Sequence, residues 1–329
     1  MRMTLADVSY DRSVPGRSVG LFLTDRCPVG CAHCSVDSRP DSPTLSNYKL
    51  FEETVGALAE RSHLRSIGIT GGEPFVERRG LTLAVDKLSA AGKCIVLFTS
   101  GVWAKRSVIP SWIRQTIRQT SCIFLSTDAF HSQTVNDEAF SRAVRCISNE
   151  GVWLVVQVLE RDVDITIEQL EHALGGNWSD FAELSRISPL PYGRGSSLFS
   201  FDEMWAADRF DYCRLAVTPL IRYDGVVTAC CNEEVIMGKG SNRLRRKCKT
   251  SLEVIDAVDG FIQDPLMLIL GNIGAGSIVS HPRYAHLKEE KFTSICHLCW
   301  AMQDATPDHE DDVIMRAASV VGRLGGVMV

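Results

Sequence analysis

GLFLTDRCPVGCAHC, residues 20–34, joins an apolar run to three closely spaced cysteines. The apolar run predicts a buried strand over Gly20–Thr24. Cys27, Cys31 and Cys34 follow in the loop after it, with the spacing C-x3-C-x2-C. Three thiolates on one short loop can wrap three corners of a cubane iron–sulfur cluster and, with no fourth cysteine nearby, leave one iron open for catalysis. A structural zinc loop is the alternative, although zinc normally takes four protein ligands.

Apolar, β-rich runs alternate with amphipathic stretches from about Val19 to Pro191. Strands are expected at Gly20–Thr24, Ser66–Thr70, Cys94–Thr99, Cys122–Thr127, Val152–Leu159 and Glu183–Ser188. Helices are expected near Leu50–Ser62, Leu81–Ala91, Arg106–Gln119, Thr134–Asn149 and Ile167–Leu174. Parallel neighbours need crossover connections, and runs such as CIVLF suit burial on both faces of a sheet. The sequence therefore predicts an open α/β barrel with its chemistry at the carboxyl ends of the strands.

A second motif, Gly71–Gly72–Glu73–Pro74, follows the second expected strand. Glycines let the backbone approach a ligand closely, and a carboxylate beside them can accept hydrogen bonds from an ammonium. With both motifs in this order, residues 19–191 resemble the radical S-adenosylmethionine (SAM) superfamily. The resemblance implies a partial (β/α)6 barrel. Its three cysteines would hold a catalytic [4Fe-4S] cluster, and Gly71, Gly72, Glu73 and Pro74 would hold the methionine amino group of SAM.

Further site residues are expected where strands three to five end. The cofactor-binding candidates there are Thr99, Ser100, Ser126 and Gln157, and the catalytic candidates are Asp128 and Glu160. Ser100 stands where related enzymes often carry asparagine. A helix N-cap is the alternative for Asp128, and His131 is expected to be a loop residue.

Two more residues complete the predicted SAM site. His33 precedes the third cysteine, where an aromatic residue is usual in this family, and its imidazole can stack on adenine. The run Pro189–Arg194 resembles the P-x-P-x-G-R sequence that ends strand six in radical SAM enzymes with C-terminal cluster domains, so Arg194 is a cofactor-binding candidate.

The alternation ends after about Ser197, so we expect a barrel over residues 15–197 and a smaller C-terminal domain over 198–329. Asp224–Gly225 predicts the turn of a hairpin. RLRRKCK, residues 243–249, is expected to be a solvated loop. After Asp304 we expect a polar loop leading to a packing helix.

A second cysteine set lies in this C-terminal region. Cys213, Gly225 and Cys230 have the spacing C-x11-G-x4-C, and Cys296-x2-Cys299 adds two thiolates. The pattern resembles the twitch or SPASM auxiliary-cluster domains, which implies one auxiliary [4Fe-4S] cluster held by Cys213, Cys230, Cys296 and Cys299. A four-cysteine zinc ribbon is the alternative. The roles of Cys231 and Cys248 are left open. Cys94, Cys122 and Cys146 are expected to pack as small buried hydrophobic residues.

Composition narrows the class of protein. The 329 residues carry a net charge of −5, which leaves no basic field for nucleic acid or for an anionic membrane. No signal sequence precedes the first strand, and the apolar runs are too short to cross a bilayer. A cytoplasmic enzyme is expected. There the 12 cysteines would ligate metal rather than form disulfides.

The resemblance implies a radical SAM oxidoreductase that receives electrons from an external donor such as flavodoxin or ferredoxin. Only about 19 residues precede the first strand, too few for a leader-peptide-binding domain. We therefore expect a small polar substrate, an amino sugar or aminocyclitol of natural-product biosynthesis, whose radical loses an electron to the auxiliary cluster. The alternatives are a ribosomal-peptide maturase that oxidises, cross-links or epimerises its substrate, a radical diol dehydratase, and a non-enzymatic metal-binding scaffold.

Overall fold

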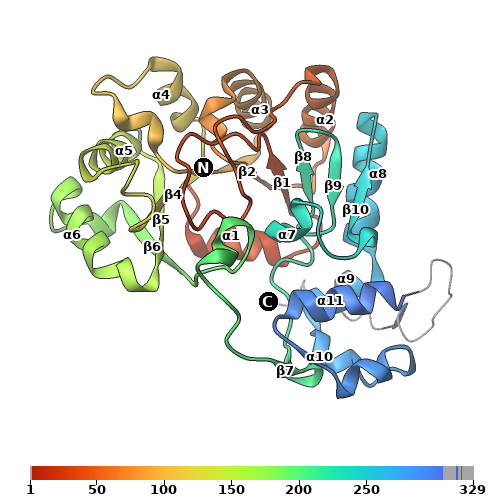
Figure 1. Cartoon of the computed structure of the whole chain (residues 1–329). Coiled ribbons are helices and arrows are strands. Elements are labelled where there is room, and N and C mark those ends of the chain that lie inside the picture. Colours follow the sequence, from red (N-terminus) through yellow and green to blue (C-terminus); the bar gives the residue numbers. More distant parts are fainter. Residues whose placement is uncertain (1, 307–315, 318–319, 321–329) are drawn as a thin grey trace.

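The computed structural model describes residues 2–306, 316–317 and 320. Within these residues the centre is a nine-stranded sheet with the order β10-β9-β8-β1-β2-β3-β4-β5-β6 (Figure 1). Its first six strands along the chain pair in parallel: β1 Ser18–Phe22, β2 Ser66–Thr70, β3 Cys94–Thr99, β4 Cys122–Thr127, β5 Trp153–Leu159 and β6 Ala182–Ile187. The predicted strands are confirmed to within two residues at each end.

Helices connect these strands in the order that the sequence predicts: α2 Tyr48–Glu60, α3 Arg78–Ala90, α4 Ser111–Arg118, α5 Asp137–Asn149 and α6 Val163–Leu174. Helix α4 begins five residues later than expected. The reason is Pro110 at its N-cap, because the ring of a proline disfavours helical geometry in the residue before it. The partial α/β barrel predicted from the sequence is confirmed.

A short helix that the sequence analysis missed closes the amino ends of the strands. Helix α1, Leu5–Ser13, begins with a capping box in which Thr4 and Asp7 exchange hydrogen bonds. The Met3 amide donates to the carbonyl oxygen of Ser121 at 3.0 Å, directly before β4. Met3 and Val8 also pack with apolar residues from β3, β4 and β5. Helix α1 therefore forms the floor of the barrel.

The C-terminal segment extends the same sheet. Strand β8, Leu220–Arg222, lies parallel to β1, and β9, Val226–Thr228, returns antiparallel to β8 through the predicted turn. The expected loop at 243–249 is wrong, because Arg245–Lys247 form the edge strand β10 on β9. An edge strand leaves charged side chains in contact with water, so a basic run is compatible with it.

Helices carry the rest of this segment: α7 Glu233–Ile236, α8 Ser251–Gln263, α9 Pro265–Asn272, α10 Ala275–Ile278 and α11 Ile295–Asp304. Strands β7, Trp205–Ala206, and β11, Lys291–Phe292, form a separate two-stranded sheet. None of the helices in the described ranges has both the length and the apolarity needed to cross a membrane. The packing helix expected after Asp304 falls largely outside the described residues, and the boundary expected at 197 stays a prediction.

Gly225 offers a test of the hairpin geometry. Its φ is +83°, and a Cβ there would lie 2.6 Å from the carbonyl oxygen of Cys248. Gly92 has a similar φ of +74° but no atom within 4 Å of such a Cβ. We expect Gly92→Ala to lower the free energy of unfolding by about 1–2 kcal/mol, the cost of left-handed backbone, and Gly225→Ala to lower it by clearly more. Anaerobic urea titrations measure both, and equal losses would contradict the clash at Gly225.

Candidate active site

The loop after β1 brings three thiols together. Cys27 and Cys31 are buried and Cys34 is half-buried, and the three are close enough to influence one another electrostatically. Burial raises the pKa of Cys27 to about 12, with further contributions from Glu73 and the other two thiols. Deprotonating Cys27 in this place is therefore unfavourable unless a cation compensates its charge, which is the situation of a thiolate bound to iron or zinc.

The loop is fixed to the barrel by backbone contacts. The Cys27 amide donates to the carbonyl oxygen of Arg39 at 3.0 Å, and the Cys34 amide to that of Cys31 at 3.2 Å. Arg194 donates from Nε and Nη2 to the Cys31 carbonyl oxygen, at 3.0 and 2.8 Å, and from Nη1 to Asp37 at 2.8 Å. The structure therefore places Arg194 behind the loop, as a support for it, and not on the cavity.

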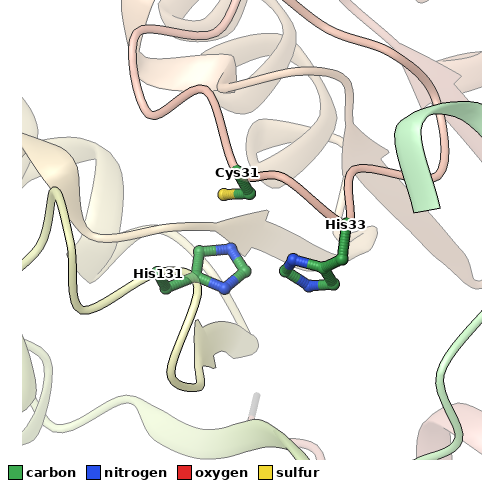
Figure 2. Close-up of side chains that lie close together, drawn as sticks. All are labelled: Cys31, His33 and His131. Atoms are coloured by element: carbon green, nitrogen blue, oxygen red, sulfur yellow. The ribbon is translucent and has the colours of Figure 1, made fainter. Parts of the chain in front are cut away.

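Two histidines face the middle cysteine, as Figure 2 shows for Cys31, His33 and His131. Their ligand atoms lie within 4.8 Å of one another. Asp128 lies between the rings, with Oδ2 2.8 Å from Nδ1 of His131 and 3.2 Å from Nε2 of His33. Burial alone would raise the pKa of Asp128, but the hydrogen bonds from both rings hold it well below its usual range. His131, expected to be a loop residue, thus belongs to the site.

The Nδ1 atom of His33 has a different environment. It is buried and no described residue offers it a hydrogen bond. The ring itself is held by stacking on Phe130, with centroids 4.6 Å apart. Since buried polar atoms are nearly always paired in native proteins, this nitrogen fits a polar ligand that would lie beside the cysteine loop.

The glycines of the second motif allow two loops to meet. The Gly72 amide donates to the carbonyl oxygen of Thr24, and a Cβ at Gly72 would lie 2.5 Å from the carbonyl oxygen of Arg26. The Glu73 amide donates to that same oxygen at 2.9 Å. A side chain at position 72 would therefore push the cysteine loop away from β2.

The Glu73 carboxylate is hydrogen-bonded to other residues of the chain. It is fully buried and accepts hydrogen bonds from Thr99 Oγ1 at 2.8 Å, from the Ser100 amide at 2.9 Å, from Ser100 Oγ and from the Phe75 amide at 3.2 Å. Burial raises its pKa, although these four donors oppose the rise. Glu73 ties the end of β2 to the end of β3 and does not line the cavity, so its side chain is not positioned to receive the ammonium group expected there.

A cavity of about 450 Å³ runs through the barrel beside the cysteine loop. The predicted residues that line it are Cys27, Cys31, His33, Cys34, Gly71, Gly72, Thr99, Ser100, Ser126, Asp128 and Gln157. The predicted residues that do not line it are Glu73, Pro74, Glu160 and Arg194. Glu160 leaves 65% of its side chain exposed and pairs with Arg186 at 2.9 Å, on the outside of the barrel.

The far wall of the cavity holds polar residues that the sequence analysis did not assign. Arg12 of α1 donates from Nη2 to Sγ of Cys231 at 2.9 Å, and both line the cavity together with Glu233. Burial raises the pKa of Glu233, partly offset by Arg12. The sequence contains no signal for this group, because Arg12 is more than two hundred residues from its partners.

The second cysteine set also converges. Cys213, Cys230, Cys296 and Cys299 influence one another electrostatically, and burial raises the pKa of each thiol, that of Cys296 to about 12. Helix α11 presents Cys296 and Cys299 one turn apart. Of the two cysteines left undecided, Cys231 contacts Arg12 and lies close enough to Cys213 and Cys230 to help raise the pKa of both thiols. Cys248 lies 3.4 Å from the carbonyl oxygen of Glu253. Four thiols gathered in one place, each with its ionisation opposed by burial, fit a closed metal shell.

No family model matches the chain. Among curated proteins, it is 26% identical to the putative peptide biosynthesis protein YydG of Bacillus subtilis (strain 168), over 87% of this chain and 92% of YydG. It is 25% identical to the antilisterial bacteriocin subtilosin biosynthesis protein AlbA of the same organism, over 41% of this chain and 31% of AlbA. The solved structure of anSMEcpe with bound AdoMet and Cp18Cys peptide is 14% identical with a TM-score of 0.51, over 95% of this chain and 97% of anSMEcpe, which shows a shared fold.

Glu73 and Glu160 form a matched pair for a stability test. Glu73→Gln places an amide against four donors that need an acceptor, so we expect it to lower the free energy of unfolding by about 1–3 kcal/mol. Glu160→Gln removes only an exposed ion pair, and we expect a loss below about 0.5 kcal/mol. Anaerobic chemical unfolding measures both. Equal stability of the two variants would show that the Glu73 carboxylate does not hold β2 and β3 together.

Proposed function

The chain belongs to the radical SAM superfamily, and from that premise we propose that it modifies a ribosomally made peptide. The observation that carries the proposal is the match to YydG, a putative peptide biosynthesis protein, over almost the whole of both chains. The shared fold with anSMEcpe, solved with a bound peptide, is consistent with it.

The proposal replaces the small-metabolite substrate expected from the sequence. That expectation rested on the few residues before the first strand, taken as too few for a leader-peptide-binding domain. The match to YydG removes the basis of that expectation. YydG is named for peptide biosynthesis, and the matched region covers 92% of its length. Oxidation of an amino sugar or aminocyclitol is therefore the alternative to be tested.

The enzyme uses SAM, a [4Fe-4S] cluster and an auxiliary [4Fe-4S] cluster. We assign Cys27, Cys31 and Cys34 to the first cluster, and Cys213, Cys230, Cys296 and Cys299 to the second. Both thiol sets fit such groups, because each set is gathered in one place, and burial raises the pKa of Cys27 in the first set and of all four thiols in the second. With the cluster and SAM bound, this site would be supplied with a 5′-deoxyadenosyl radical able to remove a hydrogen atom from the substrate.

The residues of this chain would then position and shield the reacting groups. The Gly72 backbone closes the cysteine loop onto β2, and the free Nδ1 of His33 is available to SAM. Apolar side chains such as Phe22 and Leu215 line the cavity toward the auxiliary thiols. Apolar walls limit the access of water, and a reactive carbon radical persists only where that access is limited.

Cys231 favours epimerisation among the peptide modifications. Its thiol lines the cavity and lies outside the assigned ligand set. After a hydrogen atom leaves the α-carbon of a peptide residue, the S–H group can return one to the opposite face, which inverts the residue without net oxidation. The thiyl radical left on Cys231 needs one electron from the external reductant and one proton to become a thiol again. Arg12 would hold Sγ in place during this transfer.

A candidate precursor peptide, offered to the reduced enzyme with SAM in D₂O, tests this proposal. We expect wild type to give 5′-deoxyadenosine and a peptide with one D-residue carrying one deuterium, because thiol protons exchange with solvent. Cys231→Ala should still form 5′-deoxyadenosine but no D-residue. Cys248→Ala, a buried thiol away from the cavity, should behave as wild type. Chiral amino-acid analysis and mass spectrometry provide the readout.

Three other outcomes of that experiment would count against the proposal. A peptide two hydrogens lighter would show oxidation in place of epimerisation. If Cys231→Ala still made a D-residue, a group other than the Cys231 thiol would return the hydrogen atom. If no peptide raised 5′-deoxyadenosine above background and an aminocyclitol did, the peptide substrate would be wrong.

Iron content tests the two cysteine sets separately. Anaerobic reconstitution of wild type should give about eight irons per chain, for two cubanes. The double variant Cys296→Ala, Cys299→Ala should give about four, since only the N-terminal set then remains complete. Wild type with about four irons and one zinc would support a zinc ribbon in the C-terminal segment.

A further inference from the structure

Six cations and no acid occupy residues 239–249, in a chain whose net charge is −5. We call this group the basic edge; its members are Lys239, Arg243, Arg245, Arg246, Lys247 and Lys249. Four of them, Lys239, Arg246, Lys247 and Lys249, are exposed, and the other two are half-buried. Lys239 pairs with Glu234 at 2.9 Å, and the remaining cations attract an oppositely charged partner through the field that they create.

Three members of the basic edge line a hollow beside β10, the outermost strand of the sheet. The hollow has a volume of about 310 Å³. Arg243, Arg245 and Arg246 form one side of it, and the other side comes from α8, α9 and α11 through Phe261, Asp264 and Gln303. Asp264 caps α9 by accepting from the Met267 amide at 2.9 Å, so this carboxylate is already engaged by the protein.

The same hollow adjoins the second cysteine set. Gln303 follows Cys299 by one helical turn on α11, so the hollow and the second cysteine set share this helix. On the other side, a Cβ at Gly240 would lie 2.4 Å from the ring of Trp300, so the start of the basic edge lies directly on α11. The helix that carries Cys296 and Cys299 therefore lies next to the basic edge.

Protection of an edge strand accounts for only part of this pattern. Lysine and arginine on β10 discourage pairing with another strand. This protection needs charged residues only on the strand itself. Three cations of the group, Lys239, Arg243 and Lys249, lie outside β10. Arg243, Arg245 and Arg246 also share the hollow beside α11, a placement that strand protection does not require.

We propose that the basic edge is the docking surface of an acidic electron-carrier protein, which exchanges electrons with the group held by the second cysteine set. Electron carriers form small, polar and short-lived interfaces, and opposite charge speeds their encounter. In this encounter the carrier loses one electron and the cluster gains it, so no bond forms or breaks. The inference depends on the auxiliary cluster and not on the identity of the substrate.

Binding of an acidic flavodoxin to the reconstituted enzyme, without substrate, tests the docking surface. The charge reversal Arg246→Glu with Lys247→Glu changes two exposed residues of β10. We expect it to weaken the Kd by at least about tenfold at low salt and to remove most of the salt dependence of binding. The matched control is Lys105→Glu with Arg106→Glu, two exposed residues before α4, for which we expect wild-type affinity.

Reduction kinetics provide a second readout. We expect the charge-reversed enzyme to accept electrons slowly from flavodoxin hydroquinone but at the wild-type rate from dithionite, which needs no docking. If charge reversal prevents folding, Arg246→Gln with Lys247→Gln replaces it, with a smaller loss of affinity expected in the same direction.

Three results would overturn the proposal. Unchanged flavodoxin affinity in the charge-reversed enzyme would assign docking elsewhere. An equal loss in the control variant would mean that only net charge matters. Loss of precursor-peptide affinity with flavodoxin affinity intact would assign the basic edge to the peptide.

Discussion

Arg194 donates hydrogen bonds from Nε and Nη2 to the carbonyl oxygen of Cys31, and through them the chain after β6 fastens the loop that carries the three cysteines. Thiolates repel one another strongly where water is excluded, so such a loop stays closed only if its backbone is held from outside. The contacts of Gly72 and Glu73 with the residues after β1 hold the loop from the other side. The cluster site therefore depends on contacts between the first, second and sixth strand ends.

The two carboxylates near the cysteine loop have different roles. Glu73 accepts hydrogen bonds from residues at the end of β3 and does not line the cavity. Asp128 lies on the cavity but is engaged by His33 and His131, so it orients these rings beside Cys31. Another part of the cavity wall is formed by Arg12, Cys231 and Glu233. Distant parts of the chain thus contribute polar side chains to one cavity.

Local patterns in the sequence predicted much of this arrangement. The strands from β1 to β6 and the hairpin turn at Asp224–Gly225 follow from periodicity and turn chemistry. The cysteines of each set lie close together, and their role as cluster ligands stays a prediction. Side-chain direction did not follow, because it depends on tertiary packing: Glu160 ends on the outer surface and Arg194 behind the loop. Arg12 could not be found at all, since its partner Cys231 lies at the other end of the chain. Helix α1 was missed although Thr4 and Asp7 carry the capping-box spacing, a signal that the sequence does contain.

Reductive cleavage of SAM, in the absence of any substrate, tests the central claim most directly. Anaerobically reconstituted and reduced wild type should convert SAM to 5′-deoxyadenosine and methionine, detected by chromatography. Cys31→Ala, which removes the middle ligand of the loop, should give none. Wild-type protein that holds iron but makes no 5′-deoxyadenosine, or an alanine variant that makes as much as wild type, would contradict the account.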